Sequence, residues 1–332
     1  MSEPHTFSAT DIEVLDGLKA VRRRPGMYIG STSGRGVMHM LWEVVSNSID
    51  EHLAGHATKL NIRLDPDGSW EVTDNGRGID PEHFKNLFEV IHCGPWAPPT
   101  PDGHLPHVHV HSGHGVGVVV VNALSSWLKV ESRHKGVISS QMYRKGQRTG
   151  ALGQWAGDPK DTGTTVSWMP DPEIFTEEHT PFPKTPDVAP RIRELAALTP
   201  GMKITMQGID YTAPSGLRSL TGDGPTMTNQ GRLNDIDFSI AVSWGREPST
   251  NQLFMNYVDL AQTAEDKMDR MLAASKKEGR HTVVSMLMQD PRYAGPTHQR
   301  LGDEEAIKTL RKFVKTSLKG FLVDHPELAA GS

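Results

Sequence analysis

The chain has 332 residues, of which 36% are hydrophobic, with 35 Lys and Arg against 40 Asp and Glu. This length is enough for two domains that each bury an apolar core, and no run of about 18 apolar residues is present to cross a membrane. The net charge of −5 gives no overall attraction for nucleic acid, so a contact with DNA has to be local. The single Cys93 excludes a disulfide framework, and residues 1–10 lack the pattern of a secretory leader, so we expect a cytoplasmic protein.

Apolar spacing predicts helices and strands along most of the chain. In the first part we expect a helix and turn over 11–29, a helix over 37–53, a hairpin of 60–64 with 69–73, a helix or strand over 116–125, and strands over 128–131, 136–143 and 164–169. In the rest we expect helices over 188–197, 264–274 and 303–322, and strands over 202–206, 238–244, 254–257 and 281–289.

Residues 211–233 interrupt this pattern. They are rich in Gly, Ser, Thr and Pro and have no periodicity, which predicts a linker or a long surface loop. Because helices and strands are expected on both sides of it, the simplest partition is two α+β domains, 1–220 and 221–332.

Polar residues line one face of the helix predicted over 37–53. His39, Glu43 and Asn47 follow one another at i, i+4 spacing, and Asp50 and Glu51 extend the acidic surface. A carboxylate beside an amide can orient a water and ligate a hard cation such as Mg²⁺. The alternative is an amphipathic helix with a solvated polar face.

Two glycine-rich segments are candidates for ligand contact. Residues 74–78 (DNGRG) follow a predicted strand, where a carboxylate can accept hydrogen bonds from an exocyclic amine and glycines allow close approach. Residues 112–117 (SGHGVG) open an apolar segment, and backbone N–H groups at such a turn can bind phosphates. Ordinary structural turns remain the alternative for both.

Five histidines fall between residues 104 and 114. Their spacing matches no known set of metal ligands, and the cluster lacks a Cys or a clear carboxylate partner. Adventitious nickel or zinc binding is therefore the preferred interpretation over a functional metal site.

Taken in order, these segments and several others resemble the ATP-binding domain of the GHKL superfamily, specifically the N-terminal ATPase region shared by the DNA gyrase B and topoisomerase IV B proteins. The resemblance rests on residues 11–18 (DIEVLDGL), 21–30 (VRRRPGMYIG), 43–51 (EVVSNSIDE), 74–79 (DNGRGI), 114–117 (HGVG), 121–125 (VNALS), 162–165 (TGTT) and 170–175 (PDPEIF). It implies an α+β fold, in which a Bergerat-type ATPase sandwich precedes a transducer domain of ribosomal S5-like type.

The resemblance also implies roles for individual residues. Glu43 matches the general base that polarises the attacking water, and His39 matches the residue that orients it. Asn47 matches the Mg²⁺ ligand, and Asp74, supported by Thr164, matches the carboxylate that reads adenine. The other implied nucleotide-binding positions are Asp50, Arg77, Gly78, Ile79, Gly113, Gly115, Val116, Gly117, Arg133 and His298.

The second domain departs from the family's pattern. Residues 290–302 resemble a loop that carries Gln-Thr-Lys and reaches the γ-phosphate, but Pro296 stands in place of the glutamine and His298 in place of the lysine. A lysine is fully charged at pH 7, whereas an unperturbed histidine is mostly neutral. Four prolines between residues 95 and 101 also replace a flexible lid. We therefore expect ATP binding with slow hydrolysis.

The resemblance implies partners as well as chemistry. We expect ATP and Mg²⁺ as cofactors, an ATP-induced homodimer formed through residues 7–11, and no contact with membranes. Because the sequence ends at Ser332, we expect the Toprim and DNA-cleaving parts of a topoisomerase-like system on a separate polypeptide, and DNA contact by this chain to be indirect. The alternatives are a stand-alone paralogue that acts as an ATP-dependent switch, decoy or regulator, and an inert interaction protein.

Overall fold

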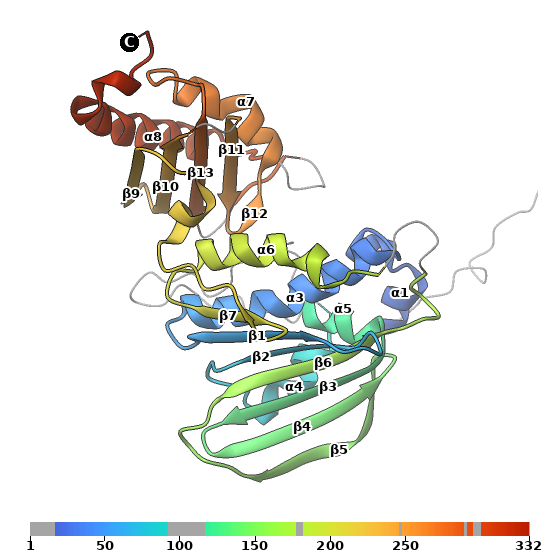
Figure 1. The fold of residues 1–332 in the computed structure, drawn as a ribbon. Coiled ribbons are helices and arrows are strands. Elements are labelled where there is room, and N and C mark those ends of the chain that lie inside the picture. Colours follow the sequence, from blue (N-terminus) through green and yellow to red (C-terminus); the bar gives the residue numbers. More distant parts are fainter. Residues whose placement is uncertain are drawn as a thin grey trace, which may run out of the picture.

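The computed structural model describes residues 17–91, 117–176, 182–245, 248–288, 291–294 and 300–331. Figure 1 shows two units, each with its own sheet, stacked on either side of helix α6 (Thr185–Leu198). The lower unit has an eight-stranded sheet and the upper unit a five-stranded one.

The first unit runs from α1 to β8 within the described residues. Its elements are α1 (Leu18–Arg23), α2 (Gly26–Ile29), α3 (Gly34–Leu53), β1 (Lys59–Leu64), β2 (Trp70–Asp74), η2 (Pro81–His83), α4 (Phe84–Glu89), α5 (Gly117–Ala123), β3 (Ser125–His134), β4 (Val137–Arg144), β5 (Gln147–Ala156), β6 (Gly163–Pro170), α6, β7 (Lys203–Met206) and β8 (Ile209–Asp210). The strands lie in the order β5-β4-β3-β6-β2-β1-β7-β8. Strands β1 and β7 pair in parallel.

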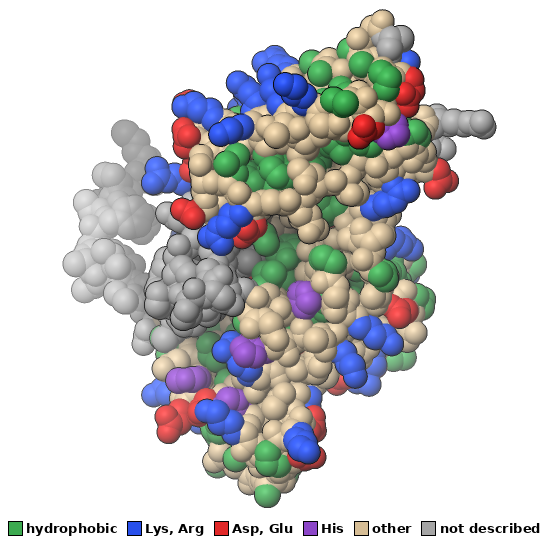
Figure 2. Space-filling view, turned by 90° about the vertical axis from the view of Figure 1, so that its left-hand side faces the viewer, with side chains coloured by type: hydrophobic (Ala, Val, Ile, Leu, Met, Phe, Trp, Pro, Cys, Tyr) green, Lys and Arg blue, Asp and Glu red, His purple; other side chains and the backbone are tan. Residues whose placement is uncertain are grey.

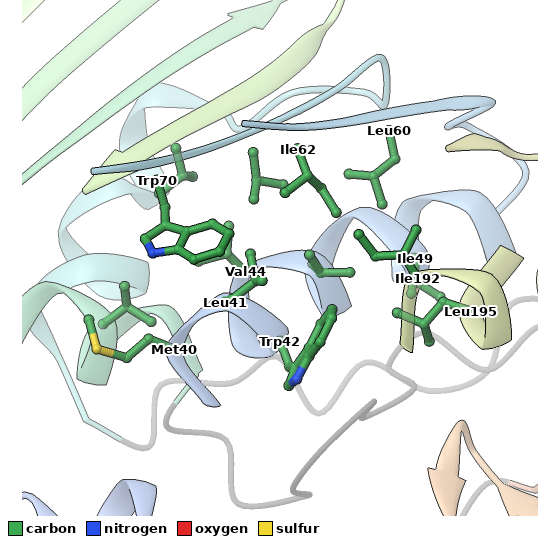
Figure 3. Packing of buried hydrophobic residues seen from close by; sticks show 14 of the residues in the cluster. Met40, Leu41, Trp42, Val44, Ile49, Leu60, Ile62, Trp70, Ile192 and Leu195 are labelled. Carbon is green, nitrogen blue, oxygen red and sulfur yellow. The ribbon is translucent and has the colours of Figure 1, made fainter. Parts of the chain in front are cut away.

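The core of the first unit lies between one face of this sheet and the helices. The alternating residues Lys59, Asn61 and Arg63 of β1 are exposed, while Leu60 and Ile62 are buried, as expected for a strand with one covered face. Figure 3 shows these side chains directed towards Val44 and Ile49 of α3 and towards Ile192 of α6. The sheet therefore fixes the position of α3 through its apolar stripe.

The second unit begins after a short 3-10 helix, η3 (Gly216–Leu220). Its elements are β9 (Thr226–Leu233), β10 (Ile236–Trp244), β11 (Thr250–Met255), β12 (Val258–Asp259), α7 (Ala261–Met271), β13 (Arg280–Leu287), α8 (Glu304–Asp324) and η4 (Pro326–Leu328), with strand order β12-β11-β13-β10-β9. Helices α7 and α8 cover one face of this sheet.

The two faces of the second sheet belong to different cores. Ile240 and Val242 of β10 and Val284 of β13 pack in the cluster under α7 and α8. Ala241 and Val283, which lie opposite each other in the β10–β13 register, belong instead to the core of the first unit. The units therefore share a packed apolar boundary.

Several expected elements are confirmed. The helix expected over 37–53 is α3, which begins three residues earlier, at Gly34. The hairpin of β1 and β2 is antiparallel, with Leu64 opposite Trp70. The ambiguous segment at 116–125 contains a helix, α5. The first expected helix is split into α1 and α2, and residues 1–16 lie outside the described part of the chain.

The prediction of a linker or loop over 211–233 is wrong. This segment contains η3 and the whole of β9, which pairs antiparallel with β10 from Thr226–Ser243 to Leu233–Ile236. The physical reason is that β9 is an edge strand in which Met227 alone is buried, so it lacks the alternation of a half-buried strand. The edge strand β5 was missed for the same reason, since most of its residues are exposed.

Candidate functional site

Two residues of the predicted polar row on α3, the acid Glu43 and the imidazole of His39, form a pair. His39 Nε2 lies 3.1 Å from Glu43 Oε1, and both side chains are largely buried. Asn47, one turn further along, is exposed. Glu43 is thus held in one orientation, whereas the side chain of Asn47 is exposed.

The start of α5 lies against Glu43. A Cβ atom added at Gly117 would lie 3.2 Å from Glu43 Oε2, so the backbone there passes close to the second carboxylate oxygen. The preceding candidate residues Gly113, Gly115 and Val116, and the histidines at 104–114, lie outside the described residues.

Asp74 ends β2 in a cage of hydrogen bonds. Its Oδ1 accepts from the backbone N–H groups of Gly76 at 2.8 Å and Thr164 at 3.3 Å, and its Oδ2 accepts from Ser48 Oγ at 2.9 Å. Burial raises the pKa of Asp74, the three hydrogen bonds oppose this, and the charge of Glu51 raises the pKa further. Since Oδ2 accepts one hydrogen bond among the described residues, it keeps a lone pair for an exocyclic amine.

The start of β6 closes on Asp74 from the other side. Gly163 has φ +141°, and a Cβ there would lie 2.2 Å from the Asp74 carbonyl oxygen. Only glycine fits this close approach. It allows Thr164 to reach Asp74, and the contact is made by the backbone N–H of Thr164.

Glu51 and Arg77 tie the glycine turn back to α3. Arg77 donates from Nη2 to Glu51 Oε1 at 2.7 Å and from Nε to Oε2 at 3.1 Å, and its backbone N–H also donates to Oε2. Burial alone would raise the pKa of Glu51, but the hydrogen bonds and charge of Arg77 outweigh it and lower that pKa. Arg77 is therefore a fixed part of the turn.

The remaining predicted residues surround this corner. Ser132 Oγ accepts from Ile79 N–H at 2.6 Å, and a Cβ on Gly78, at φ +74°, would lie 2.2 Å from the Arg133 carbonyl oxygen. The Arg133 guanidinium pairs with Asp161 at 3.2 Å. Asp50 is buried on α3, and its charge acts on Tyr257 of the second unit.

Sequence reasoning missed Ser48 and Ser132, which orient Asp74 and Ile79. The signal for Ser48 was a small polar residue within the apolar stripe of α3, where it is 2% exposed. His298 lies outside the described residues.

The side chains of this corner fit a metal ion that is held mainly by the phosphates of a bound nucleotide and only in part by the protein. Among the described residues, no group of three His, Cys, Asp or Glu side chains could hold a metal ion. Mg²⁺ commonly takes one or two protein oxygens and completes its shell with water and phosphate, so the exposed amide of Asn47 fits that role beside a bound triphosphate.

The comparisons define the class of protein. The family model described as "Histidine kinase-, DNA gyrase B-, and HSP90-like ATPase" matches residues 32–173, which contain Glu43, Asn47, Asp74 and Thr164. Residues 32–173 therefore form an ATPase domain of that family, and this domain is of the gyrase B type.

Individual relatives agree with this assignment. The DNA gyrase B protein of Streptococcus pneumoniae is 32% identical over 374 aligned positions, which cover 97% of this chain and 56% of that protein. The corresponding protein of Staphylococcus aureus is 32% identical, with 97% and 57% covered. The chain thus spans a little over half the length of these relatives.

Solved structures show the same fold. The 43K ATPase domain of Thermus thermophilus gyrase B, in complex with an aminocoumarin, has a TM-score of 0.70 and 26% identity, with 94% of this chain and 91% of that chain covered. The topoisomerase IV ATP-binding domain of Francisella tularensis, in complex with a small-molecule inhibitor, has a TM-score of 0.69 and 23% identity, with 95% and 94% covered. The expected α+β fold, an ATPase sandwich followed by a transducer-like sheet, is confirmed. None of the helices in the described residues is long and apolar enough for a membrane span.

Asp74→Asn is expected to weaken adenine nucleotide binding about tenfold or more, because the new amide group presents a donor where the adenine amine needs an acceptor. Isothermal titration calorimetry with ATP and ADP measures this. Asp223→Asn, the same change at an exposed site, is the control. Unchanged affinity in Asp74→Asn would remove this residue from adenine recognition.

Glu51→Gln is expected to remove part of the protein's stability at neutral pH. The folded-state pKa of Glu51 is lowered, so its contribution is present above the unfolded-state pKa of about 4.3 and is lost as pH falls through the folded-state value. Urea unfolding midpoints at pH 7 should differ between variant and wild type, and the difference should shrink at pH 3. A difference that stays constant with pH would contradict this assignment.

Proposed function

We propose that this chain hydrolyses ATP slowly and dimerises on ATP, as the ATPase part of a type II DNA topoisomerase-like system. The observation that carries this proposal is the buried Glu43, held by His39 on the helix that also presents Asn47 and adjoins Asp74. Adenine would be read at Asp74, and the triphosphate would lie along α3 towards Glu43.

The residues divide the chemistry between them. ATP supplies the phosphoanhydride bond, and Mg²⁺ held by Asn47 would neutralise phosphate charge. Glu43 orients the attacking water and accepts its proton, while His39 keeps Oε1 in place. Because phosphoryl transfer depends mainly on positioning and charge neutralisation, this small set of groups is sufficient.

The slow rate is inferred from the sequence. His298 replaces a lysine of the family, so it contributes less positive charge to the transition state at pH 7. Asp50, Arg77, Gly78, Ile79, Arg133 and the lid positions Gly113 to Gly117 complete the proposed nucleotide site.

The role in a type II DNA topoisomerase-like system is proposed because the similar curated proteins are DNA gyrase B proteins. The two-domain division at 220 and 221 is supported by the two separate sheets. Dimerisation through residues 7–11, a separate polypeptide for DNA cleavage and cytoplasmic location are proposed on the family resemblance. The comparisons do not favour the alternative of a stand-alone switch or decoy.

A basic face on α8 supports a local contact with DNA. Five exposed cations lie along this helix: Lys308, Arg311, Lys312, Lys315 and Lys319. Apart from the pair of Lys308 with Glu305, no ion pair of these side chains occurs within the described residues. Figure 2 shows Lys and Arg side chains gathered over the upper unit. Such a stripe can neutralise backbone phosphates although the whole chain is acidic.

Glu43→Ala is expected to lower the turnover number by about 10²-fold or more, because proton transfer to a positioned base contributes at least that much. Nucleotide affinity should stay close to that of the wild type. Single-turnover hydrolysis and calorimetry measure the two quantities separately. Equal turnover in both proteins would exclude Glu43 as the base.

Lys312→Ala with Lys315→Ala is expected to weaken duplex DNA binding and to lower the slope of log affinity against log salt by about 2, one unit for each lost phosphate contact. Lys59→Ala with Lys203→Ala, on the first sheet, is the matched control. Fluorescence anisotropy across a salt series measures both. The same loss in the control would refute a contact specific to α8.

A further inference from the structure

The turn between β11 and β12 has an unusual sequence for its shape. Met255 and Val258 pair across a two-residue turn, and Asn256 and Tyr257 within it have φ of +47° and +66°. Turns with both central residues in the left-handed region favour Asn-Gly, because a side chain at the second position is strained. A tyrosine stands there instead.

The aromatic ring of Tyr257 accounts for this choice. It is 1% exposed and belongs to the core of the first unit, although it comes from the second sheet. Its hydroxyl donates to the carbonyl of Leu198 at 3.4 Å, at the end of α6, and its own carbonyl accepts from Arg191. The Arg191 guanidinium also lies 5.7 Å from the ring centroid of Phe254. The turn thus inserts the side chain of Tyr257 into the core of the first unit, and this buried side chain is called the plug below.

The same ring belongs to the core that buries α3, the helix that carries the proposed site. Burial raises the pKa of the Tyr257 hydroxyl, and the charge of Asp50 raises it further. Asp50 follows Asn47 by three residues on α3, and the two share a side of the helix. The geometric link to α3 runs through α6: Tyr257 contacts α6 at Leu198, and Figure 3 shows Ile192 and Leu195 of α6 packed beside Ile49 of α3 in the same core.

Asn256 attaches the turn to the second unit. Its Nδ2 donates to the carbonyl of Met288 at 2.7 Å, and its Oδ1 accepts from the Met288 N–H at 2.9 Å. Its backbone N–H donates to the carbonyl of Met286 at 2.8 Å. The end of β13 is therefore locked to the residue next to Tyr257.

We propose that Tyr257 is a positioning residue of the ATPase site, which holds α6, and through their shared core α3, in one arrangement relative to β13. This inference rests on the proposed function. Tyr257, which packs in the first unit, and Asn256, which is hydrogen-bonded to Met288, are adjacent residues. A nucleotide that shifts α3 therefore also shifts the end of β13. For the same reason, α3 reaches its catalytic position only together with a movement of the second sheet.

Two glycine variants test this inference. Tyr257→Gly suits the left-handed backbone but removes the plug, and Asn256→Gly keeps the plug but removes the side-chain bonds to Met288. The second variant leaves the buried Tyr257 ring in place, so it stays informative if the first does not fold. Asp235→Gly is the matched control: Asp235 occupies the same position of the Asn234–Asp235 turn, with φ +59°, but its side chain is 96% exposed.

Each protein is measured by calorimetry with ADP, by ATP turnover, and by hydrogen exchange in β13 with and without a non-hydrolysable ATP analogue. Wild type and Asp235→Gly should show an analogue-dependent change of exchange in β13. Tyr257→Gly and Asn256→Gly should keep ADP affinity, lose that change, and turn over ATP about tenfold more slowly. A residue with only a structural role would lower the melting temperature without separating turnover from ADP affinity.

The outcomes distinguish this inference from the proposed function. If wild-type protein binds and hydrolyses ATP but the analogue leaves β13 unchanged, or if both glycine variants keep the change and the rate, the inference is overturned and the ATPase function stands. If wild-type protein binds no adenine nucleotide, both are overturned.

Discussion

The packing of α3 against the first sheet is the constraint on which the rest of the structure depends. Its apolar stripe is buried, so the rotation of the helix about its own axis is set by core packing. At 3.6 residues per turn, that rotation also decides where Glu43 and Asn47 point. The free energy that orients the site is therefore the hydrophobic free energy of Met40, Leu41 and Ile49 leaving water.

Around this helix, the corner at Asp74 combines three segments far apart in the sequence. A buried carboxylate is costly unless hydrogen bonds stabilise it, and Ser48, Gly76 and Thr164 supply them from α3, the glycine turn and β6. Their donors hold the carboxylate in one orientation before a ligand arrives. The second unit reaches the core that buries this helix through Tyr257, which contacts the end of α6.

Strong local patterns could be read from the sequence. The stripe of α3, the β1–β2 hairpin and the glycine turn after Asp74 were predicted with small errors at their ends, because each is determined by short-range periodicity or turn chemistry. Strand β9 was mistaken for a linker, since an edge strand with one buried residue has no such periodicity. Ser48 was missed because its role depends on a carboxylate 26 positions away.

The sequence by itself determined which residues form the polar row of α3, where the glycine-rich segments lie, and which family the first unit belongs to. These properties follow from neighbouring residues and their order. Tertiary structure alone decided that Thr164 serves Asp74 through its backbone, that Arg77 is engaged by Glu51, and that Tyr257 lies in the core of the other unit. Each of those contacts joins distant segments, and their approach is set by how sheets and helices pack.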